Sequence, residues 1–282
     1  MNATAQQIAQ LRQLQPFLGD PWFQSLEARK KSEAEFHDAD RVGHRDELER
    51  ATGNRRFYAA ARPVSDLMER WIGHQSPGAL VLDFACGNGS STLLAAKAGA
   101  ALAVGIDISQ VSVANAVENA QRAGLGQRTL FLQRDCEATG LPDSCFDAIL
   151  CTGMLHHLEL SRAFPELHRI LRPGGRIFCG EALAYNPFIQ LYRELTPDLR
   201  TDWEKRHILG MREVRFARLW FGVENLQFHL MTAPLATLLP QGVMRDTGLR
   251  VGHAIDAVLT RVPLLRLLSW QFTFELVRLD RK

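Results

Sequence analysis

The sequence has 282 residues, 46% of them hydrophobic and 23% charged, which is the composition of a folded globular protein and excludes a mainly disordered chain. Lys and Arg number 33 and Asp and Glu 31, so the net charge is only +2. Because nucleic-acid binding usually requires a concentrated basic field, this balance predicts that no nucleic acid is a partner.

The sequence predicts neither a membrane span nor an export signal. The longest stretch without a formal charge, residues 225–244, is interrupted by His229, Pro234 and Pro240, so no membrane-spanning segment is predicted. The first residues lack the basic start and apolar run of a secretory signal, and the five cysteines form no CxxC pair. We therefore expect reduced thiols and a cytoplasmic protein.

Along the chain, a charge-dense, helix-like stretch precedes a series of short apolar runs that alternate with helical patterns. Strands are predicted at residues 79–84, 101–106, 129–133, 146–151 and 176–180. This alternation is typical of βαβ units, so we predict an α/β fold with a parallel sheet and a ligand crevice at the carboxyl ends of its strands. Two last strands are predicted at GLRVGHAI (248–255) and WQFTFELVRL (270–279), joined by a helical segment.

A glycine-containing turn, VLDFACGNG, follows the first strand at residues 81–89. Gly87 and Gly89 lack a Cβ, which permits a tight turn and close approach to a ligand. Nicotinamide dinucleotide sites also use GxG, but they favour Gly or Ala where this chain has Thr92. Asp83 would repel a pyrophosphate and suits a ligand that carries an ammonium group. The alternative is a structural turn without a ligand.

Two more carboxylates follow strands. Asp107 ends the second strand, where an acidic side chain can accept hydrogen bonds from two ribose hydroxyls; the alternative is a helix N-cap at Asp107 or Ser109. Asp135 follows the third strand. A carboxylate there can accept a hydrogen bond from the exocyclic amine of adenine, while the Cys136 N–H donates one to a ring nitrogen. Alone, Asp135 fits a solvated turn equally well, but together with the other carboxylates it indicates a nucleoside site.

Four segments resemble the successive motifs of the class I S-adenosylmethionine-dependent methyltransferases, in order and spacing: VLDFACGNGSSTLLAA, VGIDIS, RDCEATGLPDSCFDAILCTGMLHHL and LRPGGRI. A later stretch, EALAYNPFIQLYRELTPDLRTDWEKRH, is similar to a region of bacterial small-molecule methyltransferases. The resemblance implies S-adenosyl-L-methionine as cofactor and a Rossmann-like, doubly wound seven-stranded sheet, mostly parallel with the last strand antiparallel. It implies an N-terminal helical lid (1–75), a cofactor-binding core (76–181), a helical substrate cap after strand five (182–248) and final strands (249–282).

The resemblance also assigns binding roles. The cofactor-binding residues would be Asp83, Ala85, Gly87 and Gly89 for the methionine part, Asp107 for the ribose, Ile108, Asp135 and Cys136 for adenine, and Thr152 and Gly153 near the sulfonium. Tyr58 and His37 are candidates for the lid, with helix packing as the alternative. His37, Asp38, Asp40 and His44 offer no firm third ligand at metal spacing, so no metal site is predicted.

The candidate catalytic residues are His156 and Glu181. An imidazole titrates near neutral pH, so His156 could act as a general base; its alternative is packing at the start of a helix. Glu181 ends the fifth strand beside the same crevice and carries the alternative base role, or pairs with an arginine. Arg193, Arg200 and Arg206 could clamp an anionic substrate, but interleaved acidic residues favour a solvated, self-paired helix face.

We predict a methyltransferase that moves a methyl group to O, N or C of a small-molecule acceptor by in-line displacement, chiefly by holding the two reactants aligned. Three alternatives remain: a non-catalytic S-adenosylmethionine-binding partner or regulatory protein, a lipid or quinone methyltransferase, and a nicotinamide oxidoreductase, which Asp83 and Thr92 disfavour. The identity of the acceptor and the oligomeric state do not follow from the sequence.

Overall fold

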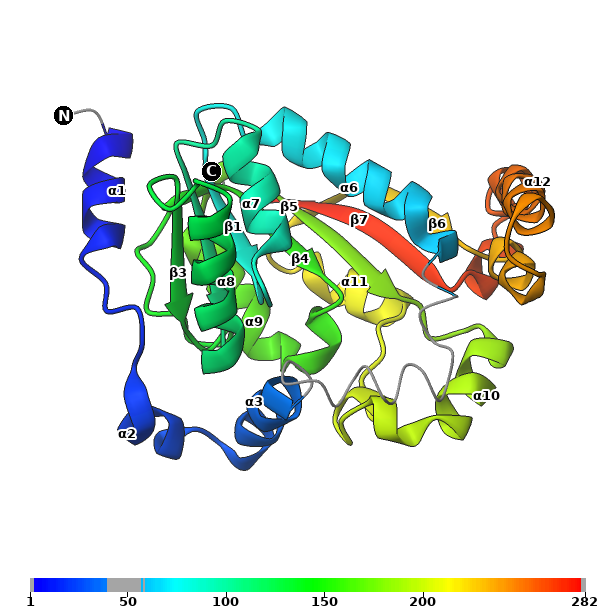
Figure 1. Ribbon diagram of the computed structural model, residues 1–282, viewed down its shortest axis with the longest axis horizontal. Coiled ribbons are helices and arrows are strands. Elements are labelled where there is room, and N and C mark those ends of the chain that lie inside the picture. The colour runs from blue at the N-terminus through cyan, green and yellow to red at the C-terminus, as the bar shows by residue number, and fades with distance from the viewer. Residues whose placement is uncertain (1–2, 40–56, 58, 280–282) are drawn as a thin grey trace.

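A computed structural model describes residues 3–39, 57 and 59–279 (Figure 1). Its centre is a seven-stranded sheet in the order β3-β2-β1-β4-β5-β7-β6. The strands are β1 (Leu80–Phe84), β2 (Leu102–Asp107), β3 (Thr129–Gln133), β4 (Phe146–Thr152), β5 (Leu171–Ala182), β6 (Gly222–His229) and β7 (Gln271–Val277). Strands β1 to β5 pair in parallel, whereas β7 runs antiparallel to both of its neighbours. The predicted Rossmann-like sheet with an antiparallel last strand is confirmed.

Helices cover both faces of this sheet and extend from it at both ends (Figure 1). The α-helices are α1 (Ala3–Arg12), α2 (Gly19–Ser25), α3 (Ala28–Ala39), α6 (Arg62–Gln75), α7 (Ser90–Lys97), α8 (Gln110–Arg122), α9 (Leu160–Ile170), α10 (Pro187–Leu195), α11 (Met211–Ala217) and α12 (Val243–Leu259). Short 3-10 helices are η2 (Ala59–Ala61), η3 (Leu155–His157), η4 (Pro197–Leu199), η5 (Glu204–Arg206), η6 (Ala233–Leu238) and η7 (Leu265–Leu268).

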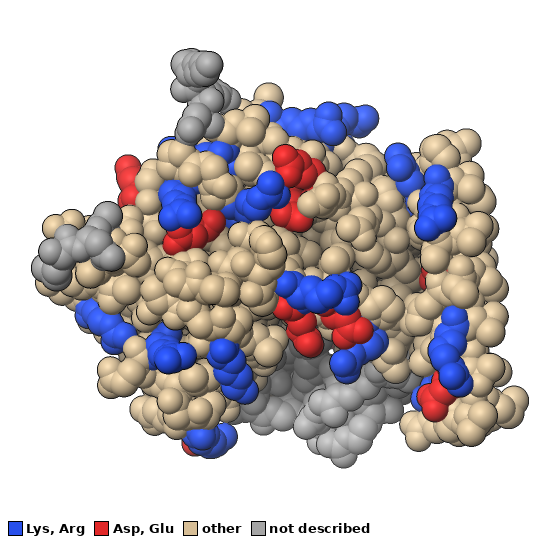
Figure 2. All heavy atoms as spheres, turned by 90° about the horizontal axis from the view of Figure 1, so that it is seen from above, with Lys and Arg blue, Asp and Glu red and all other residues tan. Residues whose placement is uncertain are grey.

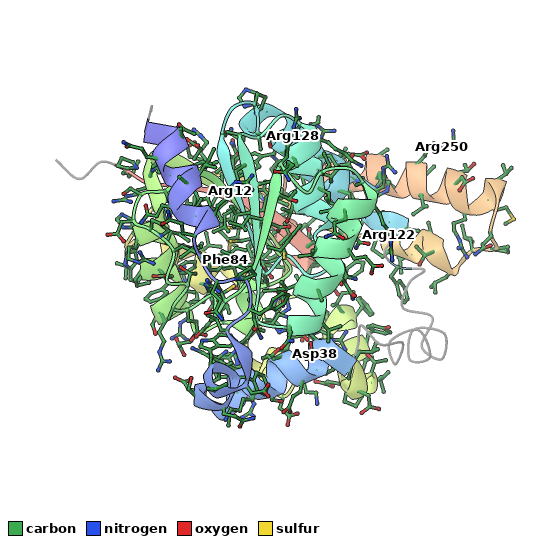
Figure 3. The ribbon with its side chains drawn as sticks, turned by 60° about the vertical axis from the view of Figure 1, so that its left-hand side comes forward. Arg12, Asp38, Phe84, Arg122, Arg128 and Arg250 are labelled. Carbon is green, nitrogen blue, oxygen red and sulfur yellow. The ribbon has the colours of Figure 1, made fainter. Side chains whose placement is uncertain are left out.

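The two faces of the sheet follow from the alternation of side chains along each strand. In β1, Leu82 and Phe84 belong to the same buried apolar cluster as residues of α9 and α11, and Figure 3 shows Phe84 in the middle of the molecule. Val81 points to the opposite face and packs against Trp71 of α6 and Ala95 of α7. Both faces are therefore buried, as the near-continuous apolar strands require.

The strand order reverses between β1 and β4, since β1 pairs with β2 on one side and with β4 on the other. At such a switch point the connections leave in opposite directions, which opens a crevice at the carboxyl ends of the strands. The ends of β1, β2, β4 and β5 therefore determine what lies in the crevice.

One predicted strand is wrong: residues 248–255 lie inside α12 rather than in the sheet. Gly248 and Gly252 lie one turn apart on the face of α12 that contacts η6, and a Cβ on Gly252 would come within 2.7 Å of the Ala233 backbone. The two glycines thus permit α12 to pack closely against η6, whereas in the sequence they resembled the glycines that bound or interrupt a strand. Among the described residues, no helix combines the length and apolar character needed to cross a bilayer.

The strand that takes this place, β6, lies within residues 182–248, which were predicted to be helical. It is an edge strand that pairs with β7, and its register shifts between Glu224 and Gln227. Asn225, inside this irregularity, has a φ of +50°. The bulge breaks the two-residue alternation by which a strand is recognised, so the sequence pattern concealed it. The four-segment division of the chain stays a prediction.

Candidate active site

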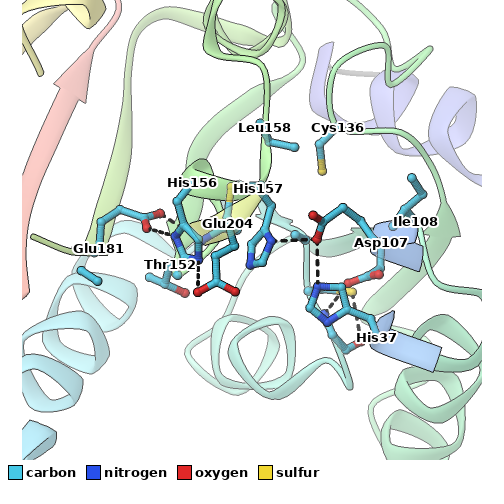
Figure 4. Close-up of a pocket in the computed structure, with 18 of the residues that line it drawn as sticks. His37, Asp107, Ile108, Cys136, Thr152, His156, His157, Leu158, Glu181 and Glu204 are labelled. Atoms are coloured by element: carbon cyan, nitrogen blue, oxygen red, sulfur yellow. Dashed lines mark hydrogen bonds and ion pairs between the residues drawn. The ribbon is translucent and has the colours of Figure 1, made fainter. Parts of the chain in front are cut away.

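A cavity of about 720 Å³ lies at the carboxyl edge of the sheet, between α3 on one side and residues 193–204 on the other. The structure brings most of the predicted site residues to its wall: Asp83, Ala85, Gly87, Asp107, Ile108, Asp135, Cys136, Thr152, Gly153, His156 and Glu181. Gly89 is not among the lining residues, and Tyr58 lies outside the described residues. Figure 4 shows several of these side chains converging from different strands.

The turn after β1 depends on residues with positive φ. Ala85, Gly87 and Gly89 have φ values of +67°, +51° and +81°. A Cβ on Gly89 would come within 2.9 Å of the Phe131 ring, so glycine is required there by both conformation and space. Gly89 is thus a structural member of the loop at the start of α7, while Gly87 faces the cavity.

Asp83 is buried at the end of β1, and its Oδ2 accepts hydrogen bonds from the Thr92 N–H (3.0 Å) and hydroxyl (2.8 Å). Burial raises the pKa of Asp83 to about 6, against the lowering effect of the bonds from Thr92. A carboxylate in so dry a place is stabilised by a cationic neighbour. Thr92, the residue that departs from the dinucleotide pattern, therefore serves to hold this carboxylate.

Asp107 fixes the glycine loop from the end of β2. Its Oδ2 accepts the Gly87 N–H at 2.8 Å, and its Oδ1 accepts the Ser109 N–H at 2.9 Å. Ser109 itself is the N-cap of α8 and accepts the Ser112 N–H. The N-cap alternative thus applies to Ser109 and leaves the Asp107 carboxylate on the cavity wall.

At the other end of the cavity, α3 is tied to the segment after β3 by buried ion pairs. Lys30 Nζ lies 2.7 Å from Asp135 Oδ2 and 2.9 Å from Glu137 Oε2, and Arg29 also pairs with Glu137. Burial alone would lower the pKa of Lys30, but the hydrogen bonds that it donates to the two carboxylates raise it above its usual value. Helix α3 therefore lines one side of the cavity. Lys30 was not among the predicted site residues because it lies in a run of charges.

His156 and Glu181 form a hydrogen-bonded pair. His156 Nδ1 lies 2.6 Å from Glu181 Oε2, and Glu181 Oε1 accepts the backbone N–H groups of Met154 and Leu155 (Figure 4). Burial alone would lower the pKa of His156, but the charges of Glu181 and Glu204 and the bond to Glu181 raise it above its usual value. The other ring nitrogen of His156, Nε2, lies 3.9 Å from Glu204 Oε1.

A second histidine, His157, links α3 to this site. Its Nδ1 lies 2.9 Å from Glu33 Oε2, and the Thr201 hydroxyl donates to the other oxygen of Glu33. Burial alone would raise the pKa of Glu33, but the hydrogen bond and charge of His157 lower it below its usual value. The predicted lid residue His37 stacks edge-on against His157, at 5.3 Å between ring centroids.

Two groups in the described part of the chain bring possible metal-ligand atoms within 4.8 Å of one another: Glu33, His37 and His157; His156, His157 and Glu204. Within the second group, Glu204 already pairs with Arg193 at 2.9 Å and Arg200 at 3.6 Å. Those two arginines therefore pair with an acidic neighbour on the cavity wall, as the interleaved acids indicated, but their side chains are only 11% and 10% exposed rather than solvated. Asp40 and His44 lie outside the described residues, and the absence of a metal site stays a prediction.

A glycine loop after β1 and three carboxylates at successive strand ends line one cavity at the switch point, which is the arrangement that the resemblance to class I S-adenosylmethionine-dependent methyltransferases implies. A family model described as a methyltransferase domain matches residues 82–179 of this chain.

Curated relatives match the same core. The chain is 34% identical over 107 residues to 27-O-demethylrifamycin SV methyltransferase of Amycolatopsis mediterranei, covering 38% of this chain and 39% of the relative. It is 34% identical over 134 residues to ribosomal protein L11 methyltransferase of Burkholderia ambifaria, and this match covers 45% of this chain and 40% of the relative. The chain thus spans about two fifths of the length of these relatives.

Solved structures share the fold over more of the chain. Geranyl diphosphate C-methyltransferase of Streptomyces coelicolor A3(2), in complex with Mg²⁺, geranyl-S-thiolodiphosphate and S-adenosyl-L-homocysteine, has a TM-score of 0.62 and 14% identity, covering 90% of this chain and 99% of that one. The [4+2]-cyclase SpnF has a TM-score of 0.52 and 20% identity, and the match covers 76% of this chain and 80% of that one. At these identities the likeness concerns the fold.

Proposed function

We propose that the protein is an S-adenosyl-L-methionine-dependent methyltransferase that transfers a methyl group to O, N or C of a small-molecule acceptor. The observation that carries this proposal is the convergence of Asp83, Asp107 and Asp135 with the Gly87 backbone on one cavity wall. The relatives named as methyltransferases support it, and two of them differ in acceptor, one a rifamycin and one a ribosomal protein.

The residues present fit the cofactor. Buried Asp83, raised in pKa by desolvation, suits the ammonium group of the methionine part. Asp107 uses one lone pair of each oxygen on a backbone N–H and keeps others for two ribose hydroxyls. Asp135 and the Cys136 N–H would bind the adenine edge, with Ile108 against the ring, and Thr152 would lie beside the sulfonium.

When bound, S-adenosylmethionine supplies a methyl group already activated by its positive sulfur. The chain's task is then to hold an acceptor atom in line with that methyl group and to keep water out. Residues on both sides of the cavity serve this purpose: α3 covers it from one side, and Arg193 and Glu204 close it from the other.

His156 is the group best placed to accept a proton from the acceptor. Glu181 accepts the Nδ1–H, which leaves Nε2 as the basic nitrogen. Because Glu181 raises the pKa of His156, acceptor turnover at saturating cofactor should increase with pH through a value above 6.5, the ordinary histidine pKa. Glu181→Gln should shift this limb to lower pH and slow turnover; an unchanged pH profile in that variant would remove His156 and Glu181 from proton transfer.

A lipid or quinone acceptor is the second candidate. Phe36, Met68, Leu158 and Phe178 give part of the cavity wall an apolar surface, which suits a prenyl or acyl chain. A polar metabolite or natural product would instead use the buried polar groups around Glu204. A cytoplasmic location also belongs to the proposal; all five cysteines are free and buried, as expected of reduced thiols.

The test is incubation of the purified protein with methyl-labelled cofactor and a small-molecule extract of a bacterial cell, followed by mass spectrometry. A labelled product that disappears in the Asp107→Asn variant supports the proposal. Tight cofactor binding without any labelled product in polar or lipid fractions would favour a non-catalytic binding protein.

A further inference from the structure

Exposed apolar side chains are concentrated in one small part of the molecule. In the described part of the chain, eleven of the seventeen large apolar side chains that are exposed lie within residues 235–268, which comprise most of η6, all of α12 and η7. The most exposed include Val243 at 79%, Val258 at 62% and Leu264 at 81%. Scattered surface leucines are ordinary, but a contiguous group of this kind indicates a partner.

On α12 these side chains share one side of the helix. Met244, Val251, Ile255 and Val258 recur at helical spacing, whereas Gly252 and Asp256 point to the body of the protein. Asp256 anchors the helix there, because its carboxylate accepts the N–H groups that follow β6. The helix is thus held by its small and polar side, and its apolar side faces outward.

The charges around this apolar surface are basic. Residues 235–268 contain four arginines and two aspartates, of which only Asp246 is exposed. Arg250 extends from α12 away from the body (Figure 3), and neither it nor Arg261 pairs with a carboxylate of the described residues. Figure 2 shows this end of the molecule as mostly uncharged surface with basic side chains and a smaller acidic area beside them.

The combination of exposed apolar and basic side chains favours one kind of binding partner over others. Two copies of the chain would bring like charges together, which opposes self-association through this surface. An anionic bilayer offers the complement of both features, since apolar side chains enter the acyl boundary and arginines meet lipid phosphates. We propose that residues 235–268 form a docking surface for an anionic lipid bilayer, with α12 lying in the plane of the interface.

The docking surface is joined directly to the cavity. Leu249 of α12 and Ala233 of η6 pack with Ala60 and Ala61, and Ala61 also lines the cavity. Docking would therefore place the cavity wall next to the membrane. The proposal concerns the surface itself and does not depend on methyl transfer, so each can fail without the other.

The experiment is co-sedimentation of the full chain with vesicles of phosphatidylcholine alone or mixed with phosphatidylglycerol. We expect binding to the mixed vesicles that weakens with salt. Val258→Glu and Leu264→Glu should each lower the partition coefficient about tenfold or more, because an apolar group leaves the acyl region and a like charge replaces it. Arg250→Gln should lower the partition coefficient for the mixed vesicles about fivefold, because one attraction to the lipid phosphates is lost.

Leu219→Glu is the matched control, since Leu219 is 57% exposed and lies outside the docking surface. It should leave binding unchanged, and circular dichroism should show all variants folded. The proposal is overturned if the wild type sediments with neither vesicle, or if the control loses as much binding as Val258→Glu. Light scattering that shows a dimer abolished by Val258→Glu would assign the surface to a second copy instead.

Discussion

Replacing Asp107 by Asn perturbs the residue that joins the glycine loop to the ribose position. The carboxylate accepts N–H groups from Gly87 and Ser109 at 2.8 and 2.9 Å, and the amide can replace only one of these acceptors. One orphaned N–H costs about 1–3 kcal/mol of folding free energy. Binding loses a charge-assisted bond to a ribose hydroxyl and places the loop less firmly, together about 3 kcal/mol, or roughly 150-fold in Kd.

Titration calorimetry with S-adenosylhomocysteine measures this loss, and thermal unfolding shows whether the variant remains folded at the titration temperature. Asp143→Asn is the matched control, because the Asp143 side chain is 75% exposed and undergoes the same chemical change away from the cavity. The reasoning is refuted if folded Asp107→Asn binds within about threefold of the wild type. It is also refuted if the control loses affinity equally.

Three further outcomes are expected. Lys30→Ala should lower the free energy of unfolding by about 3–5 kcal/mol in a denaturant titration, since it leaves buried Asp135 without its cationic partner and removes one of the cations that pair with Glu137; a loss below about 1 kcal/mol, which is what a surface ion pair contributes, would contradict a buried network. Gly89→Ala should abolish cofactor binding at a cost of at least about 2 kcal/mol in stability, because its φ of +81° and its lack of free space both exclude a Cβ; an unchanged melting temperature would contradict this. Cofactor affinity should fall by up to about tenfold per pH unit below about 6, as Asp83 is protonated in the free protein, and a flat affinity between pH 5 and 7 would contradict an ammonium partner. The same raised pKa makes the unliganded fold less stable as pH rises from the ordinary value of 3.8 to about 6.

The core of the fold could be predicted because each of its strands is marked by a pattern of neighbouring residues in the sequence. Each strand from β1 to β5 is a short apolar run followed by a turn or a helical pattern, and buried parallel strands have no other appearance in sequence. Asp83 and Asp107 could be placed for the same reason, since the carboxyl ends of parallel strands meet at one edge of the sheet.

The rest depends on contacts between distant residues, which no local pattern records. The pairing of Lys30 with Asp135 joins positions 105 residues apart, and that of His157 with Glu33 joins positions 124 apart. In the sequence the charges of α3 looked like a solvated surface. The His156–Glu181 pair was predicted only in part. Both residues were predicted to lie beside the same crevice, but the hydrogen bond between them is evident only in the structure.

Local patterns also misled where packing set the conformation. Residues 248–255 combine Val, Ile and Gly, which favours a strand, yet close contact with η6 makes them helical. The bulge at Asn225 had the opposite effect and hid β6.

The central claim is that one cavity at the carboxyl edge of the sheet grips an adenosyl amino acid through three carboxylates. A crystal structure of the protein with S-adenosylhomocysteine tests it most directly. We expect the ammonium group within hydrogen-bonding reach of Asp83, both ribose hydroxyls on Asp107 and the adenine amine at Asp135. Density for the ligand at any other surface, or a complex in which the ribose does not contact Asp107, would contradict the account.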